Sequence, residues 1–99
     1  MRDPLDIEGN ELIDQNRKDV AELEHLKDVD DLKWLMSSKR GRRIVNRLLK
    51  NAGVFRSSFH TNALQMSFNE GNRNFGLKLL ADVTEHCPDR YTEMMEETK

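Results

Sequence analysis

The stretch SKRGRRIVNRLLKNAG, residues 38–53, has the clearest helical pattern in this chain of 99 residues. Its apolar residues recur in steps of one and three, which places them on one face of a helix. They are Ile44, Val45, Leu48, Leu49 and Ala52. The other face is basic, with Arg40, Arg43, Arg47 and Lys50. Ser38 can cap the start and Gly53 stands where a left-handed residue often ends a helix, so residues 39–51 are predicted to be an amphipathic helix.

The sequence before this stretch predicts helix with a thin apolar stripe. Residues 1–9 contain Pro4 and Gly9 and are expected to form a loose arm. Residues 11–29 place a few apolar side chains near one face of a helix, which would need a partner surface to be stable. Asp30 or Asp31 can cap a separate short helix over residues 32–36.

The sequence after it predicts a loop and two more helices. Phe55 and Phe59 are expected to anchor the loop of residues 54–61 in the core. A long helix from Thr61 or Asn62 to His86 follows, and Pro88 can begin a last short helix. The predicted core seam of the long helix is Leu64, Phe68, Phe75, Leu79 and Val83.

These patterns predict an all-α fold, a small helical bundle of four to five helices with a separate acidic N-terminal helix. We expect two parts, an acidic arm or helix over residues 1–30 and a compact helical domain over residues 31–99. No strand, repeat or low-complexity tract is indicated.

The charges are divided more sharply than the net charge of −2 suggests. Residues 1–31 hold eleven acidic and four basic residues, a net charge of −7, whereas residues 32–56 hold eight basic residues and no acid, a net charge of +8. Residues 57–99 have a net charge of −3. With only 36% hydrophobic residues, this pattern favours a chain whose core is completed by partners.

Several classes of protein are disfavoured by what the sequence lacks. No apolar run approaches the roughly 20 residues of a membrane span, and the start lacks the apolar segment of a signal peptide. Cys87, the only cysteine, excludes an intrachain disulfide. His25, His60 and His86 lack the spacing of zinc ligands. We therefore expect no catalytic residues, cofactor or metal, and no enzyme.

Two polar clusters are candidate sites. The first is basic and can contact either nucleic-acid phosphates or acidic protein surfaces, of this chain or of neighbouring subunits. It comprises Lys39, Arg40, Arg42, Arg43, Arg47, Lys50 and Arg56. Asn46 and Asn51 are the candidates for reading bases from the same helix. The second cluster, Glu70, Asn72, Arg73 and Asn74, is predicted to form a structural polar network, with a partner contact as the alternative.

Several blocks of residues resemble a known phage protein family. They are DLKWLMSS (31–38), RGRR (40–43), AGVFR (52–56), FNEG (68–71), Arg73-Asn74 and GLKLLAD (76–82). In combination they are similar to a small virion-associated family of tailed, short-tailed bacteriophages, first named from a Bordetella phage open reading frame. The resemblance covers about residues 31–97. Asn46 departs from the pattern, which commonly has a large aromatic residue there.

The resemblance implies a virion component, made in the host cytoplasm. Together with the charge blocks it leads us to expect a multi-copy structural protein at the portal and head-to-tail region, or among internal proteins ejected with DNA. Its partners would be portal, head–tail or internal virion proteins and other copies of itself, with possible non-specific DNA contact. The alternative is a phage-encoded DNA-binding accessory protein that uses the basic helix 39–50.

Overall fold

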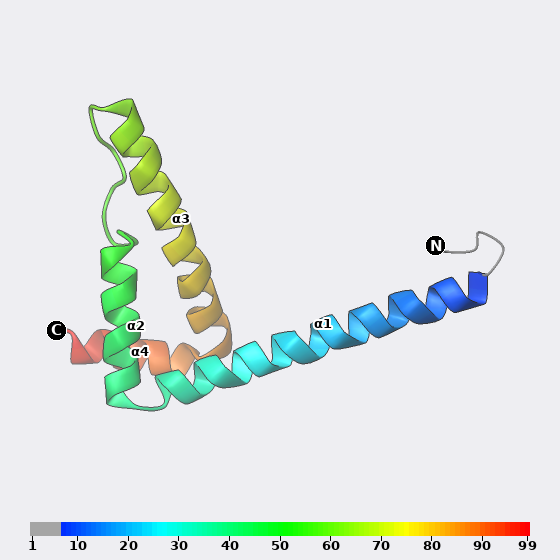
Figure 1. Ribbon diagram of the computed structural model, residues 1–99. Coiled ribbons are helices and arrows are strands. Elements are labelled where there is room, and N and C mark those ends of the chain that lie inside the picture. The colour runs from blue at the N-terminus through cyan, green and yellow to red at the C-terminus, as the bar shows by residue number, and fades with distance from the viewer. Residues whose placement is uncertain (1–6) are drawn as a thin grey trace. The chain divides into compact units, whose positions relative to one another are not determined.

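The computed structural model describes residues 7–99, and four helices run through them with no strand (Figure 1). They are α1 (Ile7–Met36), α2 (Lys39–Asn51), α3 (Ala63–His86) and α4 (Pro88–Glu97). The prediction of a small all-α bundle is confirmed. The contacts divide the described residues into an N-terminal unit, which ends at Asp31, and a C-terminal unit, Leu32–Lys99.

Helix α1 is continuous where the sequence analysis predicted two helices. Asp30 and Asp31 lie inside it and cap nothing. The chain has neither Gly nor Pro from Asn10 to Met36, and an Asp in a helix interior costs less than about 1 kcal/mol relative to Ala, too little to end the helix. The predicted loose arm is also wrong for residues 7–9, which are helical; its other residues lie outside the described part of the chain.

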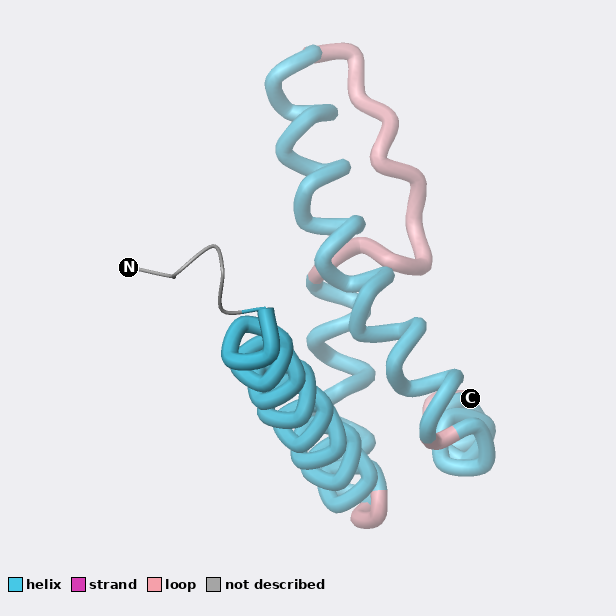
Figure 2. Tube along the Cα trace, turned by 90° about the vertical axis from the view of Figure 1, so that its right-hand side faces the viewer, coloured by secondary structure: helices cyan, strands magenta, loops and turns pink. Residues whose placement is uncertain are grey.

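The C-terminal unit is built around α2 and α3, which run side by side in opposite directions (Figures 1 and 2). Helix α4 crosses near the start of α2 and the end of α3, and packs against both. The predicted cap of α2 is confirmed, because the Ser38 hydroxyl oxygen accepts a hydrogen bond from the Gly41 N–H at 3.0 Å. Gly53 follows α2 with a φ of 79°, the left-handed conformation expected of it.

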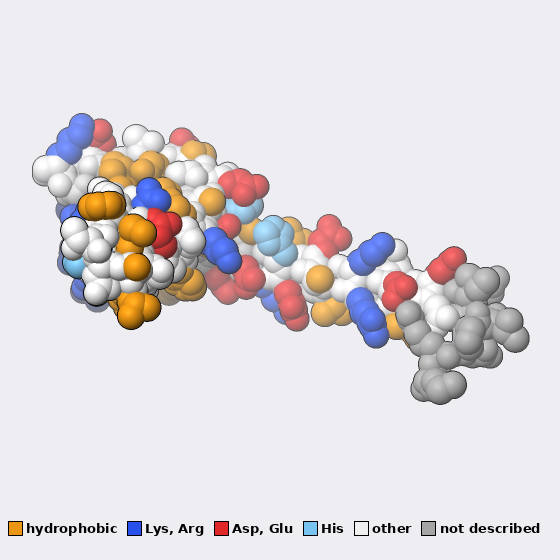
Figure 3. Space-filling view, turned by 90° about the horizontal axis from the view of Figure 1, so that it is seen from above, with side chains coloured by type: hydrophobic (Ala, Val, Ile, Leu, Met, Phe, Trp, Pro, Cys, Tyr) orange, Lys and Arg blue, Asp and Glu red, His pale blue; other side chains and the backbone are white. Residues whose placement is uncertain are grey.

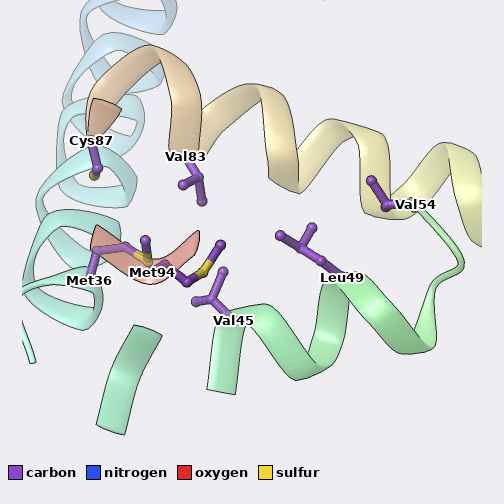
Figure 4. Close-up of a cluster of buried hydrophobic side chains, with 7 residues drawn as sticks. All are labelled: Met36, Val45, Leu49, Val54, Val83, Cys87 and Met94. Atoms are coloured by element: carbon purple, nitrogen blue, oxygen red, sulfur yellow. The ribbon is translucent and has the colours of Figure 1, made fainter. Parts of the chain in front are cut away.

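Seven buried apolar side chains form the core of the C-terminal unit, and they point toward one another from the last turn of α1, the three other helices and the loop after α2 (Figure 4). They are Met36, Val45, Leu49, Val54, Val83, Cys87 and Met94. Val45 and Leu49 confirm the predicted inner face of α2. Leu48 of the same predicted face is half exposed, so the buried stripe is narrower than its apolar pattern.

Much of the predicted aromatic core lies on the surface. Phe59 and Phe75 are 73% and 76% exposed, and Phe55, Leu64 and Phe68 are exposed as well. For Leu64 and Phe68 the reason is length: α3 has 24 residues and spans about 36 Å, whereas α2 has 13 and spans about 20 Å. The first half of α3 therefore extends beyond α2, and only the loop runs beside it (Figure 2).

Arg42 is the buried charge of this unit, with 5% of its surface exposed. Its Nε and Nη2 atoms each lie 2.8 Å from Oε1 of Glu97, and Nη2 lies 3.3 Å from Glu93. Its Nη1 donates to the backbone carbonyl of Met36 at 3.0 Å, one of the carbonyls that the end of a helix leaves without a partner. One side chain thus joins the end of α1, α2 and α4. Arg42 was predicted to contact a partner together with the other cations of this stretch. That prediction is wrong for Arg42, because its side chain is buried.

Two glycines allow close approach between backbone segments. A Cβ at Gly41 would overlap the carbonyl oxygen of Leu35. A Cβ at Gly76 would lie 2.5 Å from Cγ2 of Val54 and 2.6 Å from Cβ of Ala52, so α3 contacts the end of α2 only because this position has no side chain. Gly71, five residues earlier in α3, has nothing within 4 Å of the same position.

The two glycines of α3 provide a matched pair of substitutions. We expect Gly71→Ala to stabilise the protein by up to about 1 kcal/mol, since Ala is the better helix former. Gly76→Ala should destabilise it by about 1–3 kcal/mol, because the new methyl group overpacks the contact with Ala52 and Val54. Urea unfolding followed by circular dichroism measures both, and a Gly76→Ala variant as stable as Gly71→Ala would contradict the close contact.

Adjacent arginines test the buried charge. Arg42→Gln should lower the free energy of unfolding by about 2–4 kcal/mol, because it removes one partner of a buried ion pair and leaves the Met36 carbonyl without its donor. Arg43→Gln, one residue away and exposed, should change stability by less than about 0.5 kcal/mol. Equal effects of the two substitutions in chemical unfolding would show that Arg42 does not hold the helices together.

Candidate functional site

The other predicted basic residues are exposed and form what we call the basic surface of α2. Its members are Lys39, Arg40, Arg43, Arg47 and Lys50. Within the C-terminal unit, no carboxylate pairs with Arg40, Arg43 or Arg47. Lys39 and Arg40 also stand in the first turn of α2, which has no acidic residue, and cations are slightly unfavourable at that end of a helix dipole. The fold of this unit therefore does not account for these charges.

Asn46 and Asn51, the candidate base-reading residues, are placed differently. Asn46 is buried on the inner side of α2, so it cannot reach a base from the exposed face. Asn51 is exposed at the end of α2. It lies at a polar pocket rather than within the basic surface.

The polar pocket is a hollow of about 150 Å³ between the end of α2, the loop after it and α3. Its lining has no acidic residue and contains two arginines, three asparagines and two serines. The lining residues are Asn51, Ala52, Gly53, Arg56, Ser57, Ser58, Asn69, Asn72 and Arg73. The pocket brings together Arg56 of the first predicted cluster with Asn72 and Arg73 of the second, which are separated by at least sixteen residues of sequence.

The predicted network among the second cluster does not form. No hydrogen bond joins the side chains of Glu70, Asn72, Arg73 and Asn74 to one another in the structure. Glu70 and Asn74 are exposed on the part of α3 that extends beyond the core, so water can satisfy them. Arg73 is half-buried, and its Nε atom is buried without a hydrogen-bond partner.

One group of side chains that could bind a metal ion was not predicted from the spacing of residues in the sequence. Asp82, Glu85 and His86 each offer a ligand atom within 4.8 Å of the others, because positions three and four apart share a face of a helix. Both carboxylates are exposed, and such groups are common on solvated helix surfaces. Cys87 beside them is buried; burial raises the pKa of its thiol, and the charge of Lys33 opposes that shift.

Large apolar side chains are exposed on both units, as the orange patches of Figure 3 show. In the N-terminal unit they are Leu12, Ile13, Val20, Leu23 and Leu26. In the C-terminal unit they include Trp34, Leu48, Phe55, Phe59, Leu64, Phe68 and Phe75. Exposed apolar surface of this extent marks interaction sites in folded proteins. None of the described helices has the length and apolar character needed to cross a membrane.

A family model described as Bbp19-like phage protein matches residues 32–96. No curated protein and no solved structure matches the chain. The matched range is about two-thirds of the chain and includes Arg42, the basic surface of α2 and the whole polar pocket. The chain therefore belongs to the Bbp19-like phage protein family.

Proposed function

We propose that this phage protein is a multi-copy structural component of the virion that acts by protein–protein assembly and not by catalysis. Its place would be the portal and head-to-tail region, or the group of internal proteins ejected with DNA. The observation that carries the proposal is the set of large apolar side chains left on the surface of both units. Membership of a phage protein family supports the biological setting.

In the C-terminal unit the exposed aromatic side chains have no packing role of their own. Phe59, Phe68 and Phe75 are each at least 65% exposed. Full burial of one such side chain is worth about 1.5–3 kcal/mol, so a partner that covers them would gain several kcal/mol. A seven-residue core beside four exposed phenylalanines is what an assembly subunit, rather than a free monomer, would show.

The N-terminal unit offers a second contact surface. Every residue from Glu11 to Asp28 is exposed, and single helices are marginally stable in water unless an apolar face is covered. Ile13, Val20 and Leu23 are spaced seven and three residues apart, which is the spacing of a helix–helix seam. This unit calls for a partner helix or groove.

Charge complementarity suggests that this partner is another copy of the chain. Residues 1–31 have a net charge of −7, and residues 32–56 have a net charge of +8. The acidic helix of one copy would contact the basic surface of α2 on the next. Such a head-to-tail contact uses two different surfaces, so it can close into a ring when the rotation between copies permits.

A matched pair of substitutions in α1 tests the assembly seam. Val20→Glu places a charge in the seam and should weaken self-association at least about tenfold, since it removes roughly 1.5 kcal/mol of apolar burial and adds a desolvated charge. Lys18→Gln changes the net charge by the same one unit on the opposite side of the helix and should have little effect. Sedimentation of the full-length chain measures self-association of both variants. Mass spectrometry of purified virions measures whether the protein is present in particles. A monomeric protein that is absent from particles would overturn the proposal.

The second candidate is a DNA-binding accessory protein, favoured by Arg40, Arg43 and Arg47, which project at helical spacing without an ion-pair partner in their own unit. Each phosphate that these cations neutralise should contribute about −0.9 to the slope of log affinity against log salt.

Fluorescence anisotropy with a DNA duplex, over a series of salt concentrations, separates this candidate from assembly alone. The double variant Arg43→Gln/Arg47→Gln should make the slope of log affinity against log salt shallower by the amount of two lost phosphate contacts, about 0.9 each. It should weaken binding to every DNA sequence alike. Lys78→Gln, an exposed cation on α3, is the control. Unchanged binding by the double variant, or no binding at low salt, would remove this candidate.

A further inference from the structure

We propose that the polar pocket binds a phosphate group, with Arg56 and Arg73 as its charged ligands. This inference is independent of the assembly role, because it rests on residues that neither the apolar seam nor the basic surface of α2 includes. The two arginines come from different elements, the loop after α2 and the middle of α3.

The positive charge of the pocket is uncompensated. Arg56 and Arg73 line a hollow of about 150 Å³ that no acidic residue lines. Glu70, three residues before Arg73 on α3, is exposed and forms no ion pair with it. Since like charges that line one hollow repel each other, a bound anion would relieve that repulsion.

Arg73 has a hydrogen-bond donor for which the protein provides no acceptor. Its Nε is buried and has no hydrogen-bond partner, and an unsatisfied buried donor is costly. The Nη2 of Arg56 donates to the backbone carbonyl of Lys50 at 3.3 Å, which leaves its other N–H groups available. A guanidinium presents its donors in a planar fork that matches the oxygens of phosphate.

The placement of hydrogen-bonding groups on two walls of the pocket favours phosphate over a carboxylate. Hydrogen-bonding groups come from both walls of the pocket: Ser57, Ser58 and Arg56 from the loop, and Asn69, Asn72 and Arg73 from α3. A tetrahedral anion can accept from two walls at once, whereas the two coplanar oxygens of a carboxylate match one guanidinium. Asn69 also donates to the Ser58 carbonyl at 3.4 Å, a contact that ties the two walls together.

The geometry of the chain turn supports a built pocket. Gly53 adopts a φ of 79° where α2 ends, and the Arg56 N–H donates to the Gly53 carbonyl at 3.2 Å. Farther along α3, Ala52 and Val54 pack closely against Gly76, which has no side chain. The loop that holds Arg56 is thus fixed against the helix that holds Arg73.

Titration of the full chain with inorganic phosphate, followed by amide chemical shifts in NMR and with chloride at matched ionic strength as the blank, tests the site. We expect saturable shifts at Gly53, Ser58 and Asn72. Arg73→Gln and Arg56→Gln should each weaken binding about tenfold, as expected for one lost charged hydrogen bond. Arg43→Gln, on the basic surface of α2, should leave the phosphate affinity within about twofold.

The source of the phosphate is decided by competition with a DNA duplex. If DNA displaces inorganic phosphate, and Arg56→Gln weakens both ligands, the pocket takes a phosphate of the nucleic-acid backbone. If phosphate binds and DNA does not compete, the pocket takes a free phosphate or nucleotide; either result supports the site. Linear, unsaturated shifts, or equal shifts in wild type and Arg56→Gln, would overturn it. Arg56 is exposed in a loop, so this variant keeps the test valid if Arg73→Gln fails to fold.

Discussion

The buried guanidinium of Arg42 is the constraint around which the C-terminal unit is organised. From its position on α2, it contacts the backbone carbonyl of Met36 in the last turn of α1 and two carboxylates of α4. Three consequences follow. Helix α4 must lie across the start of α2, the chain must turn sharply after Met36, and Gly41 must have no side chain where it approaches Leu35. The hydrogen bond from Arg90 lowers the pKa of Glu93, burial opposes that shift, and the charges of Arg42 and Arg90 add to it.

The end of the C-terminal unit that is farther from Arg42 is thinly packed, because α3 is longer than α2. Beyond Val54 and Gly76, α3 continues with only a loop beside it. Its aromatic side chains therefore remain on the surface instead of entering a core. The core of this unit has only seven buried apolar side chains, so in the proposed assembly partners would contribute much of the buried apolar area.

The cations of residues 39–56 divide into three roles once the structure is known. Arg42 holds helices together, the basic surface of α2 faces outward, and Arg56 lines the polar pocket. In sequence they all belong to one basic block, residues 32–56, with a net charge of +8. The assembly proposal uses the outward group and the phosphate proposal uses Arg56, so one block can serve two kinds of contact without conflict.

Local patterns were sufficient for much of the fold. Helical spacing, the Ser38 cap and the left-handed Gly53 predicted α2 to the residue, because caps and periodicity act within a few residues. Spacing and Pro88 also predicted α3 and α4, whereas α1 was predicted as two helices and is one. The phage family was also evident from short blocks. Tertiary structure alone decided that Arg42 is buried while Arg43 is exposed, that Phe59 and Phe75 stay on the surface, and that Arg56 and Arg73 line one pocket. Periodicity defines the faces of a helix, but which face is covered depends on the length and position of helices distant in the chain.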